Sequence, residues 1–283
     1  MQDALFFDHY GALAEKVRHS RPVRVLFLTS LRDIALEEFN GQKIKLDGNF
    51  HYMEGVIERT VNNTKKRKLL DSLVEVVGVV VDDTESDLKG KFPLLPTQGQ
   101  PWIFPTDLKN TDGSFLREKV WNIQSLFRKL PKESVEERKE AKLLFETTVL
   151  EKAREVGADV IISDGYMARI DYLQEGLGMY GKILNIHPGP AIEGMPYCFR
   201  GKDEVMDAIR FAQANGGHAK TGATLHFVNS QIDEGNAVAH VCTTEVSGND
   251  TENALMYRNY IQAKLPLFVE GMQHYVTKIF PYI

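Results

Sequence analysis

Three polar residues near the middle of the chain have side chains that could act together in acyl transfer. Asn185 and His187 belong to an Asn-Ile-His-Pro sequence, and Asp233 lies in a later Ile-Asp-Glu-Gly turn. A histidine titrates near neutral pH, a carboxylate can hold or charge it, and an amide can stabilise an oxyanion. These groups are the parts that transfer of an acyl group to an amine requires.

The sequence around these residues predicts strands that would bring them together. Near-continuous apolar runs at 23–29 and 74–81 suit parallel strands that are covered on both faces. Further strands are expected at 159–163, 183–186, 224–228 and 238–241. Strand alternation directs Asn185 and His187 to the same side. In an open α/β sheet, ligands bind in the crevice beyond the carboxyl ends of the strands, so the three residues are expected there.

Helical patterns separate these strands. Ser134 and Glu137 form a capping-box pattern at the start of a helix that ends at Gly157. One face of that helix is expected to contain Ala141, Leu144, Phe145, Thr148 and Val149. A second helix is predicted at 202–215, closed by Gly216 and Gly217, and a third at 251–275 with a kink or break near Pro266. The alternation predicts an α/β, Rossmann-like fold with a mostly parallel twisted sheet flanked by helices.

The composition favours an ordinary globular protein that acts on small molecules. The 283 residues are 43% hydrophobic with a net charge of −5, and the two cysteines cannot build a disulfide-stapled secreted fold. The 34 Lys and Arg against 39 Asp and Glu argue against nucleic acid as the main partner. The sequence shows no apolar run long enough for a membrane span and no secretory leader, so a cytoplasmic location is expected.

We expect one α/β domain over residues 21–283, preceded by an extension at residues 1–20. The polar stretches near 40–70 and 84–130 are interpreted as insertions, formed by loops or added elements. A basic run at 65–68 is interpreted as a solvated helix face.

The segments NIHPGP at 185–190 and TGATLHFVNSQIDEGN at 221–236 resemble the core of the 10-formyltetrahydrofolate-dependent formyltransferases. The upstream ADVIISDGYMARI and the later QAKLPLFVEG are similar to the folate-loop segment and the closing helix of that family. The resemblance is greatest to the glycinamide ribonucleotide transformylase branch and covers roughly Ser134 to Tyr275. It implies the formyltransferase fold and 10-formyltetrahydrofolate as the formyl donor.

The resemblance also implies roles for individual residues. Asn185 and His187 would stabilise the oxyanion, while Asp233 would hold His187 charged and help to move the proton from the nucleophile to the folate nitrogen. The folate site would be formed by Met167, Ala168, Arg169, Ile170 and Gly235. We expect no metal. A metal site built from His187, His226, Asp233 and His240 is conceivable on ligand type alone, but His226 is better explained as a structural residue.

The acceptor side departs from the ribonucleotide branch. That branch holds a phosphate with a glycine-rich turn after its first strand, whereas the turn here, Thr29 to Ile34, contains no glycine. Ile261 stands where that branch has a glutamate for the ribonucleotide. An amine acceptor without a phosphate therefore fits better, as in the N5-hydroxyornithine transformylases of siderophore pathways. Arg32 and Asp33 would pair with its carboxylate and ammonium, and the insertions would form its pocket.

Three alternatives remain open at this stage. The first is formyl transfer to glycinamide ribonucleotide in purine synthesis, the second is a catalytically silent folate-binding protein, and the third is a formyl hydrolase that uses water as the nucleophile.

Overall fold

A computed structural model describes residues 21–30, 43–46, 49–52, 55–82, 108–166, 168–175, 179, 181–194, 197–201, 203–229 and 233–283. Seven strands form one sheet in the order β5-β4-β1-β6-β7-β8-β9. Strands β5, β4, β1, β6 and β7 run parallel, and β8 and β9 are antiparallel to their neighbours. The mostly parallel sheet of the sequence prediction is confirmed.

The strands of this sheet include every strand that the sequence predicts. They are β1 (Val23–Thr29), β4 (Val74–Val81), β5 (Val120–Asn122), β6 (Val160–Ser163), β7 (Ile183–His187), β8 (His218–Phe227) and β9 (Ala237–Ser247). The short β5 was not predicted. Strands β8 and β9 are longer than predicted. Their pairing register shifts near Gly222, and this irregularity interrupts the alternation of apolar and polar residues by which a strand is recognised in a sequence. A Cβ on Gly222 would lie 1.7 Å from the carbonyl oxygen of Val241, so only glycine fits this close approach.

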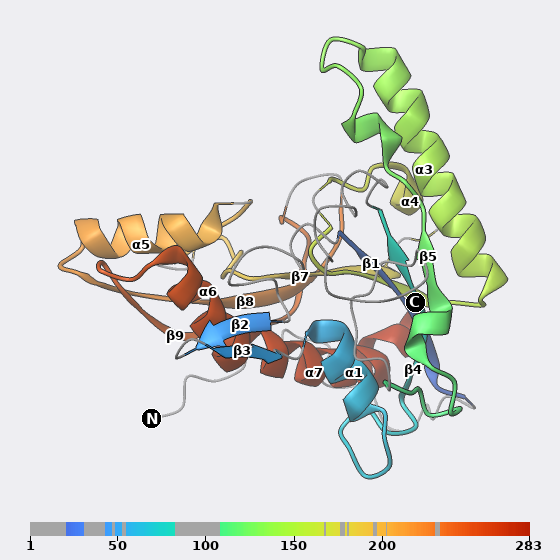
Figure 1. Ribbon diagram of the computed structural model, residues 1–283, viewed down its shortest axis with the longest axis horizontal. Coiled ribbons are helices and arrows are strands. Elements are labelled where there is room, and N and C mark those ends of the chain that lie inside the picture. Colours follow the sequence, from blue (N-terminus) through green and yellow to red (C-terminus); the bar gives the residue numbers. More distant parts are fainter. Residues whose placement is uncertain are drawn as a thin grey trace.

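Helices cover both faces of the parallel part of the sheet (Figure 1). The α-helices are α1 (Val56–Asn63), α3 (Val135–Glu155), α4 (Tyr172–Glu175), α5 (Glu204–Ala214), α6 (Glu252–Asn259) and α7 (Leu265–His274). Shorter turns of 3-10 helix are η1 (Leu116–Lys119), η2 (Leu126–Arg128) and η5 (Phe280–Tyr282), and η3 (Tyr260–Lys264) and η4 (Tyr275–Ile279) are π-helical.

Strand β1 shows how the two faces are divided. Val25 and Phe27 point into the core cluster that also contains residues of α1 and α7. Leu26 and Leu28 point to the opposite side and belong to the cluster that contains the buried face of α3. Burial on both faces explains why the strand sequence is almost continuously apolar.

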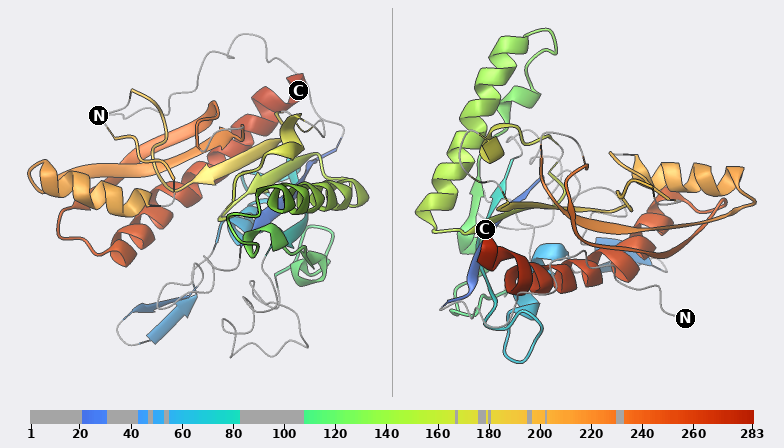
Figure 2. Two further views of the ribbon diagram at one scale, coloured as in Figure 1. Left: turned by 90° about the horizontal axis from the view of Figure 1, so that it is seen from above. Right: turned by 180° about the vertical axis from the view of Figure 1, so that it is seen from behind.

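The antiparallel end of the sheet has its own small core. Residues of α5, β8, β9 and α6 form this third cluster, among them Val205, Ala219, Val246 and Leu255. Figure 2 shows α5 lying along the extended β8–β9 ribbon. The turn after α5 closes as predicted, because Gly216 and Gly217 both adopt positive φ angles.

The expected insertions contain ordered elements in their described parts. Near 40–70 lie a separate two-stranded antiparallel hairpin, formed by β2 (Lys43–Leu46) and β3 (Asn49–Tyr52), and helix α1 (Figure 2). Near 84–130 lie η1, β5 and η2. The extension at residues 1–20 lies outside the described residues. In the described part of the chain, no helix has the length and apolar character of a membrane span.

Two local predictions about helices were wrong. Within the described structure, the Ser134 side chain makes no capping hydrogen bond, and Leu144 is 69% exposed, so it does not belong to the buried face of α3. The buried face instead includes Phe145, Glu146 and Val149. The buried face differs from the predicted one because the carboxylate of Glu146, and not an apolar side chain, occupies one of its inward positions.

The sequence predicts a kink or break near Pro266, and the helix does not break there. Helix α6 continues through the π-helical η3 directly into α7, and Pro266 lies in the first turn of α7. The N–H of Leu265 donates to the carbonyl of Tyr260, five residues earlier. This wider turn precedes the proline, whose missing N–H is tolerated at the start of a helix.

Glu146 connects α3 to the segment after β6. Its carboxylate is fully buried and accepts hydrogen bonds from the backbone N–H groups of Asp171 at 3.0 Å, Tyr172 at 2.6 Å and Leu173 at 3.0 Å. These N–H groups lie at the start of α4, where a helix has no partners of its own for them. Lys142 forms an ion pair with Asp171 and lies 3.9 Å from Glu146. Glu146 therefore fixes the conformation of residues 171–173.

We predict that Glu146→Ala lowers the free energy of unfolding by about 3–5 kcal/mol, because buried N–H groups and the nearby Lys142 lose their partner. Urea denaturation measures the change. Glu151→Ala, at an exposed position of the same helix, is the control and should stay within about 0.5 kcal/mol of the wild type. Equal losses in the two variants would contradict the anchoring role.

Candidate active site

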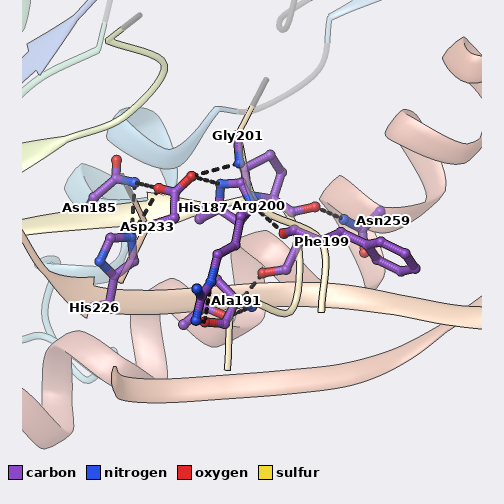
Figure 3. A network of polar contacts seen from close by, with 12 residues as sticks. Asn185, His187, Ala191, Phe199, Arg200, Gly201, His226, Asp233 and Asn259 are labelled. Atoms are coloured by element: carbon purple, nitrogen blue, oxygen red, sulfur yellow. Dashed lines mark hydrogen bonds and ion pairs between the residues drawn. The ribbon is translucent and has the colours of Figure 1, made fainter. Parts of the chain in front are cut away.

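The three residues that the sequence analysis selected meet at the carboxyl end of β7. Asn185 and His187 both belong to β7, which pairs with β8 so that Asn185 lies opposite His226. Asp233 follows β8 and adopts a φ of 53°, a left-handed conformation that is uncommon outside glycine. Figure 3 shows the Asp233 carboxylate between the side chains of Asn185 and His187.

Asp233 is surrounded by hydrogen-bond donors. Its Oδ1 accepts from Nδ2 of Asn185 at 3.3 Å, and its Oδ2 lies 3.3 Å from Nδ1 of His187. The same Oδ2 accepts from the backbone N–H of Gly201 at 3.0 Å. Burial, the largest influence, acts to raise the pKa of Asp233, but His226, His187 and Gly201 together outweigh it, so the pKa is lowered. The carboxylate is therefore ionised at neutral pH.

His187 is buried, and each of its ring nitrogens faces an acceptor. Nδ1 faces Asp233, and Nε2 lies 2.8 Å from the carbonyl oxygen of Phe199. Burial lowers the pKa of His187, while the charge of Asp233 and the Phe199 carbonyl act in the opposite direction. The charged state expected for His187 is thus opposed by burial. Because both nitrogens face acceptors, only the protonated ring can donate to both of them.

His226 is a fourth member of this cluster. Its Nδ1 lies 2.8 Å from the carbonyl oxygen of Phe227, and its Nε2 lies 3.1 Å from Nδ2 of Asn185 and 3.4 Å from Oδ1 of Asp233. His226 is predicted from the sequence to be structural, and its contacts place it against both Asn185 and Asp233.

The segment from Phe199 to Gly201 supplies backbone groups that the sequence analysis did not identify. The Phe199 carbonyl contacts His187, and the Gly201 N–H donates to Asp233. Arg200 lies between them, and its guanidinium donates to the carbonyl of Ala191 and forms an ion pair of 3.2 Å with Glu234. One short segment therefore contacts both members of the His187–Asp233 pair.

The turn after β7 is held by two further side chains. Asn259 donates to the carbonyls of Pro188 at 2.8 Å and Gly222 at 2.7 Å. Thr224 donates to the carbonyl of Gly189 at 2.9 Å. A Cβ on Gly189 would lie 2.8 Å from the Phe199 oxygen and 3.0 Å from Nε2 of His187, so glycine allows this approach.

The residues expected to contact folate follow β6. Ile170 is buried, Ala168 is half-buried, and the exposed Arg169 forms an ion pair with Asp171. Met167 lies outside the described residues. Gly235 packs against β8, where a Cβ would lie 1.6 Å from the Phe227 carbonyl oxygen. This packing explains the glycine without a ligand, and the folate contacts of all these residues stay predictions.

The residues expected to bind the acceptor, Arg32 and Asp33, also lie outside the described residues. Their described neighbour Ser30 donates from its hydroxyl to Asp82 at 2.5 Å. Asp82 is fully buried at the end of β4, and it also forms an ion pair with Arg128. The turn after β1 thus begins beside a buried carboxylate. Among the described residues, no group of three or more His, Cys, Asp or Glu side chains is arranged to hold a metal ion.

The family comparison identifies this arrangement. The pattern described as Formyl transferase matches residues 117–268, which is more than half of the chain. The chain belongs to the formyl transferase family. It is an enzyme that transfers a formyl group. Asn185, His187 and Asp233 all lie within the matched residues.

Solved structures similar to this formyltransferase cover most of its length. PvdF, described as an N10-formyltetrahydrofolate-dependent formyltransferase of pyoverdin biosynthesis, has a TM-score of 0.73 and 29% identity over 88% of this chain and 98% of its own. Phosphoribosylglycinamide formyltransferase from Bacillus halodurans has a TM-score of 0.53 and 19% identity, covering 88% of this chain and 93% of its own. Glycinamide ribonucleotide transformylase 1 from Symbiobacterium toebii has a TM-score of 0.54 and 16% identity, and the match covers 93% of this chain and 92% of its own. The last two show the fold alone. No curated protein sequence matches this chain significantly.

A buried acid, Glu204, lies at the start of α5 in this formyltransferase. Only 8% of the residue is exposed, and burial raises the pKa of its carboxyl group to about 7. The charge of Lys264 lowers this pKa, and the charge of Asp233 raises it, so Glu204 interacts electrostatically with Asp233. Its protonation changes near neutral pH.

We predict that Asp233→Asn lowers kcat by about 10²- to 10⁴-fold, because the amide cannot pair with a charged His187 or accept a proton. The fold and folate affinity should be preserved, since asparagine tolerates a left-handed φ. Tetrahydrofolate release measures the activity, and Glu234→Gln is the neighbouring control. Near-normal turnover by Asp233→Asn would refute its catalytic role.

We predict a pH-dependent gain of stability for Glu204→Gln. The folded-state pKa is raised, so the unfolded chain releases this proton first, and the native state loses stability as the pH rises from about 4.5 to 7. Removing the ionisable group should stabilise the protein by about 3 kcal/mol at pH 8 and by less than about 1 kcal/mol at pH 5. Urea denaturation at both pH values measures it, with the exposed Asp203→Asn as control. A pH-independent change would contradict the assignment.

Proposed function

We propose that this formyltransferase transfers a formyl group from 10-formyltetrahydrofolate to the side-chain nitrogen of N5-hydroxyornithine, as a step in siderophore synthesis. The main support is the likeness to PvdF, an N10-formyltetrahydrofolate-dependent formyltransferase of pyoverdin biosynthesis, of whose length 98% is matched. Since the chain belongs to the formyl transferase family, we no longer retain the alternative of a catalytically silent folate-binding protein.

The donor is 10-formyltetrahydrofolate, as the resemblance in the folate-loop segment implied. The pterin would lie against Met167, Ala168, Arg169 and Ile170, with Gly235 on the opposite side of the site. Glu146 supports this assignment, because it fixes residues 171–173 directly after the folate segment. A loop held in this way loses little conformational freedom when a ligand binds.

In the proposed reaction, the acceptor nitrogen attacks the formyl carbon with its lone pair. The π electrons of the formyl C=O bond move to oxygen, which becomes an oxyanion. Collapse of this intermediate breaks the bond between the formyl carbon and N10, and N10 leaves with that electron pair. The acceptor nitrogen loses a proton and N10 gains one, so the products are the N-formyl acceptor and tetrahydrofolate.

The chain supplies oxyanion stabilisation and a proton path. Nδ2 of Asn185 and Nε2 of His187 are the donors for the oxyanion, and each is engaged with a protein acceptor in this structure. Oxyanion formation would therefore exchange these contacts for stronger, charge-assisted ones. Asp233 stays ionised and would stabilise His187 in its charged form as the proton moves. Such an oxyanion donor contributes roughly 3–4 kcal/mol.

Two features support an acceptor without a phosphate. The turn that begins at Ser30 lacks the glycines that let backbone N–H groups approach a phosphate, and Ser30 is hydrogen-bonded to the buried Asp82. Arg32 and Asp33 remain proposed residues of the acceptor pocket, and the insertions near 40–70 and 84–130 remain its proposed enclosure.

An acceptor panel tests this function. Purified enzyme with 10-formyltetrahydrofolate is offered N5-hydroxyornithine, ornithine, glycinamide ribonucleotide or no acceptor, and tetrahydrofolate release is followed. We expect rapid release with N5-hydroxyornithine and little with the others. Release only with the ribonucleotide would assign the enzyme to purine synthesis, and equal release without an acceptor would assign it to hydrolysis. Either result would overturn the proposal.

A further inference from the structure

A buried ion pair lies at the carboxyl edge of the sheet and has no part in the mechanism described above. Nζ of Lys264 lies 2.7 Å from Oδ1 of Asp164, and their side chains are only 8% and 13% exposed. Lys264 also lies over the Tyr260 ring, 5.1 Å from its centroid. A lysine and an aspartate are rarely buried to this extent without a reason.

The position of the pair connects the ends of β1 and β6 to the catalytic turn. Asp164 directly follows β6, and its backbone N–H donates to the carbonyl of Leu28 in β1. Lys264 is the last residue of η3, and Asn259, five residues earlier, donates to the carbonyl of Pro188 beside His187. In a π-helical turn, residues five apart lie on the same side, so Asn259 and Lys264 face the same edge of the sheet.

The charge of Lys264 acts on the catalytic residues. It contributes to the lowered pKa of His187 and opposes the rise in the pKa of Glu204. The sheet register gives the geometric relation, because Ser163, directly before Asp164, pairs with Asn185. The ion pair therefore lies beside the strand that contains Asn185 and His187, without being part of the Asn185, His187 and Asp233 cluster.

Both members of the pair retain capacity for a ligand. The ammonium of Lys264 has three N–H donors, and Asp164 is its ion-pair partner among the described residues. Asp164 contacts Lys264 through Oδ1, and an ionised carboxylate can accept hydrogen bonds from more than one donor. An ammonium with three donors beside such a carboxylate is complementary to a group that has both a carboxylate and an ammonium.

Stability alone does not explain the pair. A buried ion pair commonly stabilises a protein no more than two apolar residues of similar volume would, because both charges lose their hydration. The chain neighbours of Lys264, Ala263 and Leu265, are buried apolar residues. At the edge where ligands of α/β proteins bind, recognition of a charged ligand is the better explanation.

Building on the proposed function, we propose that Lys264 and Asp164, in place of Arg32 and Asp33, recognise the α-amino-acid end of the acceptor. Lys264 binds the α-carboxylate and Asp164 binds the α-ammonium, while the side-chain nitrogen of the acceptor points toward His187. The pair thereby makes the enzyme specific for a zwitterionic acceptor.

The test compares two acceptors in a charge-neutral double variant, Lys264→Met with Asp164→Asn. The double change is used because either single change would leave an uncompensated buried charge. One acceptor is N5-hydroxyornithine, and the other is N-butylhydroxylamine, which has the same hydroxylamine and carbon chain but neither the carboxylate nor the ammonium. Lys278→Met, at an exposed position of the C-terminal helical segment, is the control, and thermal unfolding confirms that each variant is folded.

We expect the double variant to raise the KM for N5-hydroxyornithine by at least about 100-fold, because two charged hydrogen-bonded contacts are lost. The KM for N-butylhydroxylamine and the KM for 10-formyltetrahydrofolate should change by less than about twofold. An unchanged KM for N5-hydroxyornithine, or an equal loss of kcat/KM with both acceptors, would overturn the assignment of the pair.

The wild type separates this inference from the function on which it rests. Turnover of N5-hydroxyornithine by the wild type, with no selective change in the double variant, rejects only the pair as the recognition element. If the wild type turns over neither hydroxylamine acceptor, the proposed function fails, and the inference about the pair fails with it.

Discussion

Burial of the Asp233 carboxylate is the constraint on which the site depends. A charge removed from water must be compensated by donors and opposite charges, and no single element of this fold provides enough of them. Asn185 and His187 come from β7, the Gly201 N–H comes from the segment before α5, and Asp233 itself follows β8. These segments must all be in place before the carboxylate is satisfied, so the site forms only when the sheet is complete.

The same constraint links the site to the rest of the molecule. The segment that contains Phe199 and Gly201 continues into α5, which packs on β8 and β9. The turn after β7 is fixed by Asn259 of α6 and Thr224 of β8. Each contact restricts the position of His187 or Asp233, and a displacement of about 1 Å can reduce catalysis by about 10²-fold. The conformation of the reacting groups therefore depends on helices that contribute no catalytic side chain.

The sequence predicted the side chains of the site better than its backbone partners. Asn185, His187 and Asp233 could be found because strand alternation and turn composition are local properties. The Phe199 carbonyl and the Gly201 N–H could not be found, since every residue has these groups and only the folded path of the chain selects two of them. The contacts of His226 with the site could not be predicted, because its partners lie on β7 and in the turn after β8. Arg32, Asp33 and Met167 lie outside the described residues, so their roles stay predictions.

The same distinction applies to the fold. Apolar runs predicted the six strands, whereas β5, three residues long, has too little pattern to be recognised. Leu144 was assigned to the buried face because periodicity counts apolar residues, and it cannot anticipate that Glu146 is directed inward by three backbone N–H groups.

The π-helical turn at Tyr260–Lys264 has a consequence for how this family member could change over time. In an α-helix each residue advances the chain by about 100°, so residues five apart point in clearly different directions. The wider turn brings Asn259 and Lys264 into phase. Loss of one residue from this turn would restore the α-helical spacing of four residues, which also places the two side chains on one face. The π-helical turn therefore accommodates one extra residue, so a difference in length within this helix can arise while both side chains keep their place at the edge of the sheet.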